Sequence, residues 1–520
     1  MERSDTPRRW PGSGLEARIG MAALTAAVLV AATVRLAFSD YSLWFDELAS
    51  VFFASQPTAR LWSAWMLRET NPPLFYTLLR WWIQATGLSD AGLRVPGIAA
   101  SLAAIGVIYA AVARAYGRRA AVAAALLLAL SPQQLYFSHQ VRAYIFLYLA
   151  VAISFAGLVQ VLLATTARGR AIGWLLYVAG AVAGIYLHTT GVIWPATATL
   201  ALMLVDARFR PPRGGLWIAL AVAGGVIVLA SSWWLYITFR QLTQPNGNLG
   251  WMQGLGPTKS ALVYVATLLQ SRQISALQLP APLLVAGFAV LGAWRGRGEA
   301  ATRLTLACLA SATALFLVLN LKQPIFLDRT ILWLSLFPLV LAARGVGTLR
   351  GRGYGVALVA LALALGVSVV LTRPHLPRED WRAVVTRVGA DPRGALLVDG
   401  EAMGVATQMA CRVQLHRPAC PFAVVALVPP GPQLDAWGRG LASPVPARDG
   451  RLALPADARA YVLRRPFHDA LLDVQRAGLL RDADASAPAA PYVVGPYPPA
   501  LIVALAQRSR VADGTVRVER

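Results

Sequence analysis

Apolar runs of about 20 residues recur along the first 372 residues, and short polar stretches separate them. An α-helix needs roughly 20 apolar residues to cross the hydrocarbon core of a bilayer. The eleven spans that we predict are residues 21–39, 95–113, 120–137, 143–164, 172–188, 191–205, 216–237, 281–294, 304–320, 329–343 and 354–372. The pattern therefore predicts an α-helical, multi-spanning membrane protein.

The first long polar interval, residues 40–92, is expected to be an outer loop that carries juxtamembrane helices. Leu48–Ser55 and Leu61–Leu67 have the amphipathic pattern of short helices that lie on a membrane surface. Residues 74–86 form a further helix that is shorter than a comfortable span. If this helix crossed the membrane, the charge bias of all later loops would be reversed, so we predict that it does not cross.

The composition changes at Arg373, where prolines, polar residues and short Val/Leu runs begin. Four of these runs have the length of strands: residues 395–398, 423–428, 460–463 and 501–505. Two stretches between them, residues 381–388 and 468–478, have helical patterns. We therefore predict two domains, a transmembrane domain over 1–372 and a small α/β domain over 373–520.

Composition and charge support a membrane protein and set its orientation. Hydrophobic residues make up 57% of the chain and charged residues 14%. The net charge of +23 resides largely in arginines of short loops between apolar runs, which is the positive-inside pattern and not a nucleic-acid-binding surface. We thus expect a cytoplasmic N-terminus, an uncleaved first span, and a periplasmic first loop and C-terminal domain, in a bacterial inner membrane.

The three cysteines show no metal-ligand spacing. Cys308 lies in an apolar run, and Cys411 and Cys420 lie in the C-terminal domain. In an oxidising compartment the last two could pair, or they could remain free thiols, because the sequence does not determine their geometry.

Two adjacent carboxylates, Asp46 and Glu47, follow directly on the first span, in a chain with only 25 acidic residues. Acids near lipid are costly and are therefore candidates for a functional site. The alternative is a hydrated interfacial loop that Tyr41 and Trp44 anchor at the aromatic belt. If the two acids lie on an extended or helical segment, their side chains diverge and only one of them faces a cleft.

The predicted topology brings further polar groups to the same face as the two acids. These groups are Arg35, Arg94, His139, Arg142, His188, Lys322, Asp328 and Arg329, and Tyr144 lies in the same polar stretch as His139 and Arg142. The arginines and the lysine could instead snorkel to the headgroups, and the histidines could be satisfied residues of the rim. A carboxylate and cations in one cleft permit a definite reaction: the carboxylate takes a proton from an acceptor hydroxyl while the cations neutralise a leaving phosphate.

Several motifs give the chain a family resemblance. They are Ser42-Leu43-Trp44-Phe45-Asp46-Glu47, Asn71-Pro72-Pro73-Leu74-Phe75-Tyr76, Leu93-Arg94-Val95-Pro96, Tyr136 to Tyr144, Lys322 to Arg329, and Glu379-Asp380-Trp381-Arg382. In this order they resemble the polyprenyl-phosphate-sugar-dependent membrane glycosyltransferases of the GT-C type. Within that type the chain is similar to bacterial relatives of the protein O-mannosyltransferases (glycosyltransferase family 39) and of the lipid A aminoarabinose transferase.

The resemblance implies the GT-C fold and roles for the charged residues. Asp46 would be the catalytic base, and Glu47 would orient the base or the acceptor, or help to hold a divalent cation where one is used. Lys322, Arg329 and Arg142 would bind the lipid phosphate. The donor would be a polyprenyl-phosphate-linked sugar, and the acceptor a periplasmic hydroxyl of a glycan, a lipid or a protein.

The remaining rim residues, Arg94, His139, Tyr144 and His188, are candidates for the same substrate-binding surface. Asn71 stands where the aminoarabinose branch has an acid or a lysine before its Pro-Pro.

A transporter or flippase for a lipid-linked sugar is the alternative function, and an assembly protein without catalysis is a weaker one. Transporters place charges near the bilayer midplane on broken helices in paired positions, whereas here the charges gather at one rim and no internal repeat is visible.

Overall fold

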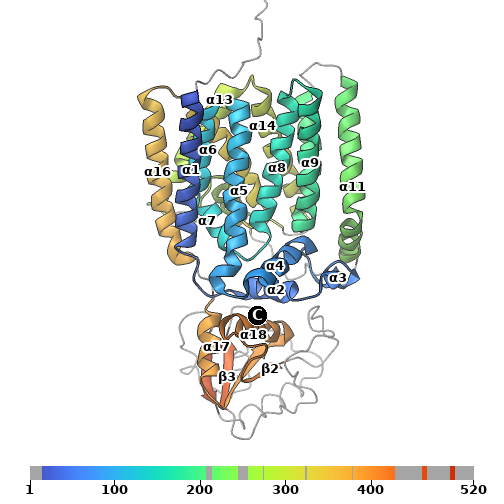
Figure 1. Cartoon of the computed structure of the whole chain (residues 1–520), viewed down its shortest axis with the longest axis vertical. Helices are drawn as coiled ribbons and strands as arrows, with labels where there is room; N and C mark the ends of the chain where they lie inside the picture. Colours follow the sequence, from blue (N-terminus) through green and yellow to red (C-terminus); the bar gives the residue numbers. More distant parts are fainter. Residues whose placement is uncertain are drawn as a thin grey trace, which may run out of the picture.

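The computed structural model describes residues 14–206, 213–243, 256–272, 275–322, 325–376, 379–427, 459–464 and 492–497. Long helices stand side by side in a bundle, and a small α/β domain lies beyond one end of it (Figure 1). Within the described residues, seven helices are long and apolar enough to cross a membrane, or eight if one bent pair counts as a single span. The α-helical multi-spanning fold is confirmed, and the chain is a multi-pass membrane protein.

The long helices follow the predicted order along the chain. They are α1 (Gly14–Leu36), α5 (Asp90–Tyr116), α8 (Tyr144–Leu163), α9 (Ala167–Leu187), α11 (Arg213–Thr243), α14 (Ala300–Asn320) and α16 (Arg352–Thr372). Shorter helices fill the other predicted spans: α10 (Ile193–Asp206) after η2 (Thr189–Val192), α13 (Pro280–Gly296), and α15 (Leu336–Gly347) after η3 (Leu332–Ser335). The exact number of eleven crossings stays a prediction.

One predicted span is not a single straight helix. Residues 120–137 divide into α6 (Arg118–Ala129) and α7 (Pro132–His139), which are bent by 53° at the break between them. Pro132 has no N–H to donate to the preceding turn, so the helix cannot continue through it, and the Ser131 hydroxyl caps the new helix by accepting from the Gln134 N–H at 3.1 Å.

Glycines allow two of the long helices to pack closely. A Cβ atom at Gly157 of α8 would lie 2.5 Å from the carbonyl oxygen of Gly173 in α9. A Cβ at Gly180 would lie equally close to the carbonyl oxygen of Ala150. Small residues at such contacts let helix backbones approach each other in a membrane.

The first outer loop contains short helices that lie across the end of the bundle, as expected. They are α2 (Phe45–Ala54), α3 (Thr58–Leu61), η1 (Ala64–Arg68) and α4 (Pro73–Thr86). Figure 1 shows α2 and α4 beneath the long helices rather than among them. The predicted helix over 48–55 therefore begins earlier, at Phe45, and the one over 61–67 is divided between α3 and η1.

The turns rich in arginine gather at the other end of the bundle. Because α1 runs towards α2 and successive helices reverse direction, the α5–α6, α8–α9, α13–α14 and α15–α16 turns all lie opposite α2. Contacts across this end agree with that arrangement: Arg344 pairs with Glu299 at 2.7 Å, and Arg114 donates to the carbonyl oxygen of Leu163 at 2.5 Å. The charge asymmetry of the sequence thus corresponds to the two ends of the fold.

The C-terminal domain begins with η4 (Arg373–His375) and α17 (Trp381–Gly389). A four-stranded sheet follows, with strand order β2-β1-β3-β4: β1 (Gly394–Asp399), β2 (Ala423–Leu427), β3 (Arg459–Arg464) and β4 (Tyr492–Tyr497). Strand β1 is parallel to β2 and β3, and β4 is antiparallel to β3. The predicted segments 468–478 and 501–505 lie outside the described residues, and α18 (Gly400–Gln414), which joins β1 to β2, was not predicted.

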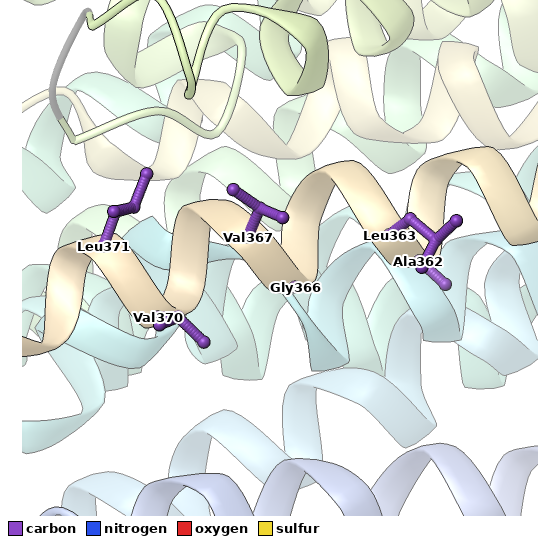
Figure 2. A pocket seen from close by; sticks show the side chains of 6 residues that line it. All are labelled: Ala362, Leu363, Gly366, Val367, Val370 and Leu371. Atoms are coloured by element: carbon purple, nitrogen blue, oxygen red, sulfur yellow. The ribbon is translucent and has the colours of Figure 1, made fainter.

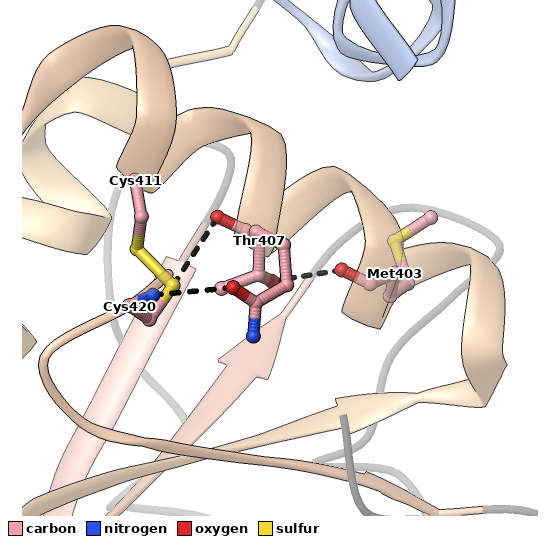
Figure 3. The surroundings of a disulfide bond; sticks show 5 residues. Met403, Thr407, Cys411 and Cys420 are labelled. Carbon is pink, nitrogen blue, oxygen red and sulfur yellow. Dashed lines mark hydrogen bonds between the residues drawn. A yellow bond between two sulfur atoms is a disulfide. The ribbon is translucent and has the colours of Figure 1, made fainter. Parts of the chain in front are cut away.

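A disulfide joins Cys411 of α18 to Cys420 in the loop before β2 (Figure 3). The sequence left this pairing open. Their Cα atoms are 5.2 Å apart, within the range that a disulfide spans. The third cysteine, Cys308, is buried in α14 as a free thiol.

Candidate active site

The N-terminus of α2 turns Asp46 and Glu47 to different sides. The helix begins at Phe45, so the two acids occupy neighbouring positions of its first turn, about 100° apart. The Asp46 side chain is 24% exposed, whereas that of Glu47 is 1% exposed. Only Asp46 is therefore open to a substrate.

Glu47 is held inside the protein by three donors. Arg94 of α5 donates to its carboxylate at 3.3 Å, and the backbone N–H groups of Trp44 and Val141 donate at 3.1 and 2.9 Å. Arg94 itself is 0% exposed and lies 3.9 Å from the ring centre of Tyr41. The buried pair joins α2, α5 and the α7–α8 loop, and neither group is exposed to a substrate.

The exposed side of Asp46 faces two arginines that come from distant loops. Arg329 approaches its carboxylate at 4.0 Å. Arg142, in the α7–α8 loop, donates to the Asp46 carbonyl oxygen at 3.1 Å and to the Ser50 hydroxyl at 3.3 Å, and it lies 5.7 Å from the Tyr144 ring centre. The structure thus brings together four of the predicted site residues: Asp46, Arg142, Tyr144 and Arg329.

His188 joins this cluster one residue beyond the end of α9. Its ring lies 5.4 Å from that of Tyr144, and its Nδ1 lies 2.9 Å from the Thr190 hydroxyl and 3.2 Å from the Thr190 backbone nitrogen. Burial, and then the charges of Arg142 and Arg329, lower its pKa to about 3. His188 is therefore a neutral group at physiological pH.

Glu69 is a second buried acid of this region that we did not predict. It lies in the loop before α4 and accepts hydrogen bonds from the Asn71 N–H at 2.9 Å, the Asn71 side-chain amide at 2.7 Å and the Tyr76 hydroxyl at 3.1 Å. Burial raises its pKa, and the charge of Arg142 acts in the opposite direction. Its position two residues before Asn71-Pro72-Pro73 is the signal in the sequence, since an acid or a lysine is expected directly before the prolines and Glu69 lies slightly upstream.

Arg272 is the second residue that the sequence analysis missed. It forms a salt bridge with Asp328, and its guanidinium lies 3.6 Å from the ring centre of Tyr136. Asp328 also accepts the backbone N–H of Arg329 at 2.8 Å, so its carboxylate links Arg272 to the chain segment that carries Arg329. An isolated arginine in a long outer loop gave no spacing from which this contact could be inferred.

Two other predicted residues lie apart from the Asp46 cluster. His139 is fully buried at the end of α7, with its ring 6.0 Å from that of Tyr41. Lys322 is exposed in the turn after α14 and makes no salt bridge to any residue that the structure describes. Their roles in substrate binding stay predictions.

The two adjacent acids do not fit a divalent cation as a pair. Both carboxylate oxygens of Glu47 already accept hydrogen bonds, and the Asp46 side chain, about 100° away around the helix, is partly exposed while that of Glu47 is buried. Across the described residues, no group of three or more His, Cys, Asp or Glu side chains could hold a metal ion.

An apolar depression on α16 is separate from these polar groups. It is lined by Ala362, Leu363, Gly366, Val367, Val370 and Leu371, all from this one helix (Figure 2). Leu363 and Val370 are largely exposed. No polar side chain lines the depression, as expected for a helix face that contacts lipid.

Comparisons with known proteins show which class of protein the chain resembles. A family model described as dolichyl-phosphate-mannose-protein mannosyltransferase matches residues 70–236. The chain has the GT-C fold, and the resemblance to the GT-C type membrane glycosyltransferases is confirmed. The family model and the fold together support a glycosyltransferase.

Two solved structures show what the chain is similar to. Apo ArnT from Cupriavidus metallidurans matches with a TM-score of 0.60 and 16% identity, over 86% of this chain and 93% of that one. The Archaeoglobus fulgidus oligosaccharyltransferase, in a complex with Zn and sulfate, matches with a TM-score of 0.51 and 14% identity, over 75% of this chain and 61% of that one. No curated protein sequence matches the chain.

Proposed function

We propose that the protein is an inverting glycosyltransferase that moves a sugar from a polyprenyl-phosphate donor to an acceptor hydroxyl, with Asp46 as the general base. The observation that carries this proposal is that the two adjacent acids lie in different environments. Glu47 is buried with Arg94, while Asp46 is exposed beside Arg142 and Arg329. A carboxylate next to two cations, on a GT-C fold, is suited to transfer from a phosphate-linked sugar.

Each group has a definite task in this reaction. Asp46 takes the proton from the acceptor hydroxyl as its oxygen bonds to the anomeric carbon. The bond from that carbon to the phosphate oxygen breaks at the same time, and the electron pair leaves with the lipid phosphate. Arg142 and Arg329 stabilise the charge on the phosphate, and neutral His188 can donate a hydrogen bond without adding charge.

The proposed donor lipid is a polyprenyl phosphate. ArnT from Cupriavidus metallidurans has been solved bound to undecaprenyl phosphate, and the Archaeoglobus fulgidus oligosaccharyltransferase AglB with an inhibitory peptide and a dolichol-phosphate. These relatives support a lipid-linked donor for this chain, with a glycan, a lipid or a protein as acceptor. The transferred sugar is a hexose or a pentose.

We place the site and the C-terminal domain on the periplasmic side of the inner membrane. The arginine-rich turns lie at the end of the bundle opposite Asp46, which supports a cytoplasmic position for those turns. The Cys411–Cys420 disulfide supports an oxidising compartment for the C-terminal domain.

The test compares Asp46→Asn with the parent and with Asp40→Asn, an exposed acid six residues earlier in the same loop. Each purified protein is incubated with a panel of polyprenyl-phosphate hexoses and pentoses and an extract of bacterial envelope acceptors. Release of polyprenyl phosphate and sugar transfer are followed by mass spectrometry. Binding of undecaprenyl phosphate is measured in parallel.

We expect Asp46→Asn to lose about 100-fold or more in turnover, the usual scale of general base catalysis, while it still binds undecaprenyl phosphate. Asp40→Asn should retain parental turnover. Parental turnover by Asp46→Asn would show that the base is a different group. A parent that transfers no sugar from any donor of the panel would refute the transferase proposal.

A further inference from the structure

The helix that carries Asp46 lacks a cap from its own N-cap residue. The first backbone N–H groups of a helix have no intrahelical partner, and a Ser, Thr, Asp or Asn at the N-cap normally satisfies one of them. The N-cap of α2 is Trp44, whose side chain has no acceptor. Glu47 accepts the Trp44 N–H from within the helix.

The next N–H of this helix is satisfied by the C-terminal domain. Glu379, 334 residues later in the chain, accepts the Phe45 N–H at 2.9 Å. Phe45 directly precedes Asp46, so this hydrogen bond holds the backbone at the proposed base. A carboxylate at this place also interacts favourably with the positive end of the α2 dipole.

Glu379 is itself held in position by its own domain. The indole N–H of Trp381 donates to the same carboxylate oxygen at 2.7 Å, and Trp381 is completely buried. The following helix, α17, is capped by Asp380, which accepts the Ala383 N–H at 3.0 Å. The cap for α2 therefore comes from a rigid element rather than from a free side chain.

Further contacts hold the C-terminal domain against the segment before α2 and the start of α5. The Arg382 N–H donates to the Ser42 hydroxyl at 3.0 Å, and the Arg382 guanidinium binds the buried carboxylate of Asp90 at 2.6 Å. Gln414, at the end of α18, donates to the same Asp90 oxygen at 2.6 Å. Helix α18 also packs against α2, and Figure 1 shows it directly below that helix.

We propose that Glu379 is a positioning residue for the active site, so that the C-terminal domain completes the site by capping the helix that carries Asp46. This inference rests on the proposed role of Asp46 as the base. Without the cap, the first turn of α2 frays, and the Asp46 carboxylate spends less time within reach of the acceptor hydroxyl. The sugar donor, which the arginines bind, should be affected far less.

The experiment uses the full-length protein with three substitutions. Glu379→Ala removes the acceptor, Glu379→Gln keeps one acceptor oxygen, and Thr386→Ala changes an exposed residue of the same helix, α17, as a control. Amide hydrogen exchange of the peptide that contains Phe45 reports the cap directly and needs no substrate. Where the parent transfers sugar, kcat and the donor KM are measured for every variant over a range of pH.

We expect faster exchange at Phe45 and a loss of about five- to tenfold in kcat for Glu379→Ala, the factor that corresponds to a lost helix cap, with an unchanged donor KM. Glu379→Gln should retain most of the parental kcat and most of the parental protection from exchange at Phe45. Thr386→Ala should match the parent in both measurements. The proposal is refuted if exchange at Phe45 does not rise in Glu379→Ala, or if it rises while kcat stays parental. A parent without any transfer would refute the proposed function instead, and the exchange data alone would then decide whether Glu379 caps α2.

Discussion

The buried pair of Glu47 and Arg94 should contribute stability and not chemistry, and replacement of Glu47 by Gln tests this. The side chains are 1% and 0% exposed, and three donors converge on the Glu47 carboxylate. Removal of one partner from a buried ion pair leaves the other charge uncompensated, at a cost of about 3–5 kcal/mol. Because Gln keeps one oxygen for the backbone N–H groups, we expect Glu47→Gln to lose about 3 kcal/mol, at the lower end of that range.

A double-mutant cycle separates the pair from its surroundings. Unfolding by titration with SDS in mixed micelles gives the stability of the parent, Glu47→Gln, Arg94→Met and the double variant. The double variant removes both charges and leaves neither one uncompensated. Its loss of unfolding free energy should therefore be smaller than the sum of the losses of the two single variants, by about 1–3 kcal/mol. Asp46→Asn is the matched control and should leave the unfolding curve nearly unchanged, because its side chain is partly exposed and its ion pair with Arg329 is 4.0 Å long. If Glu47→Gln unfolds as the parent does and yet abolishes transfer, Glu47 acts in the chemistry and our assignment of the two acids is wrong.

Three further predictions follow from the same cluster and from the C-terminal domain. Neutralising Arg329 or Arg142 should weaken binding of undecaprenyl phosphate by about 10- to 100-fold, since a hydrogen bond to a charged group contributes roughly 1.5–3 kcal/mol; unchanged affinity in both variants would place the phosphate elsewhere. Burial raises the Glu69 pKa, so the folded state favours the protonated form of this carboxyl group. The contribution of protonated Glu69 to the free energy of unfolding is therefore present at low pH and is lost as the pH rises through the folded-state pKa. Glu69→Gln should therefore flatten the fall in stability as the pH rises above the ordinary carboxyl pKa, and an unaltered pH profile would contradict this. Reduction of the Cys411–Cys420 disulfide, which closes a loop with a sequence separation of 9, should destabilise the C-terminal domain by about 2.5 kcal/mol; quantitative alkylation of both cysteines in unreduced protein from cells would show that they are free thiols.

Local patterns determined much of this protein. The length of the apolar runs predicted the long helices, because spanning a bilayer sets a minimum length for an apolar helix. The arginines of the short turns predicted one end of the bundle, and the helical or extended geometry at Asp46 and Glu47 predicted that these neighbours face different sides. Each of these properties depends on residues that are close together in the sequence.

Only the tertiary structure decided which residues meet. It buried Glu47 rather than Asp46, because the complementary charge of Arg94 lies 47 residues further along the chain on α5, and a buried carboxylate needs such a partner. It also brought Glu69 and Arg272 to the same end of the bundle and placed Glu379 over the start of α2. Such contacts have no sequence period, since they arise from the packing of distant helices and of a second domain. The sequence by itself therefore determined the helices and the acidic pair, and the packing decided which acid is exposed and which groups surround it.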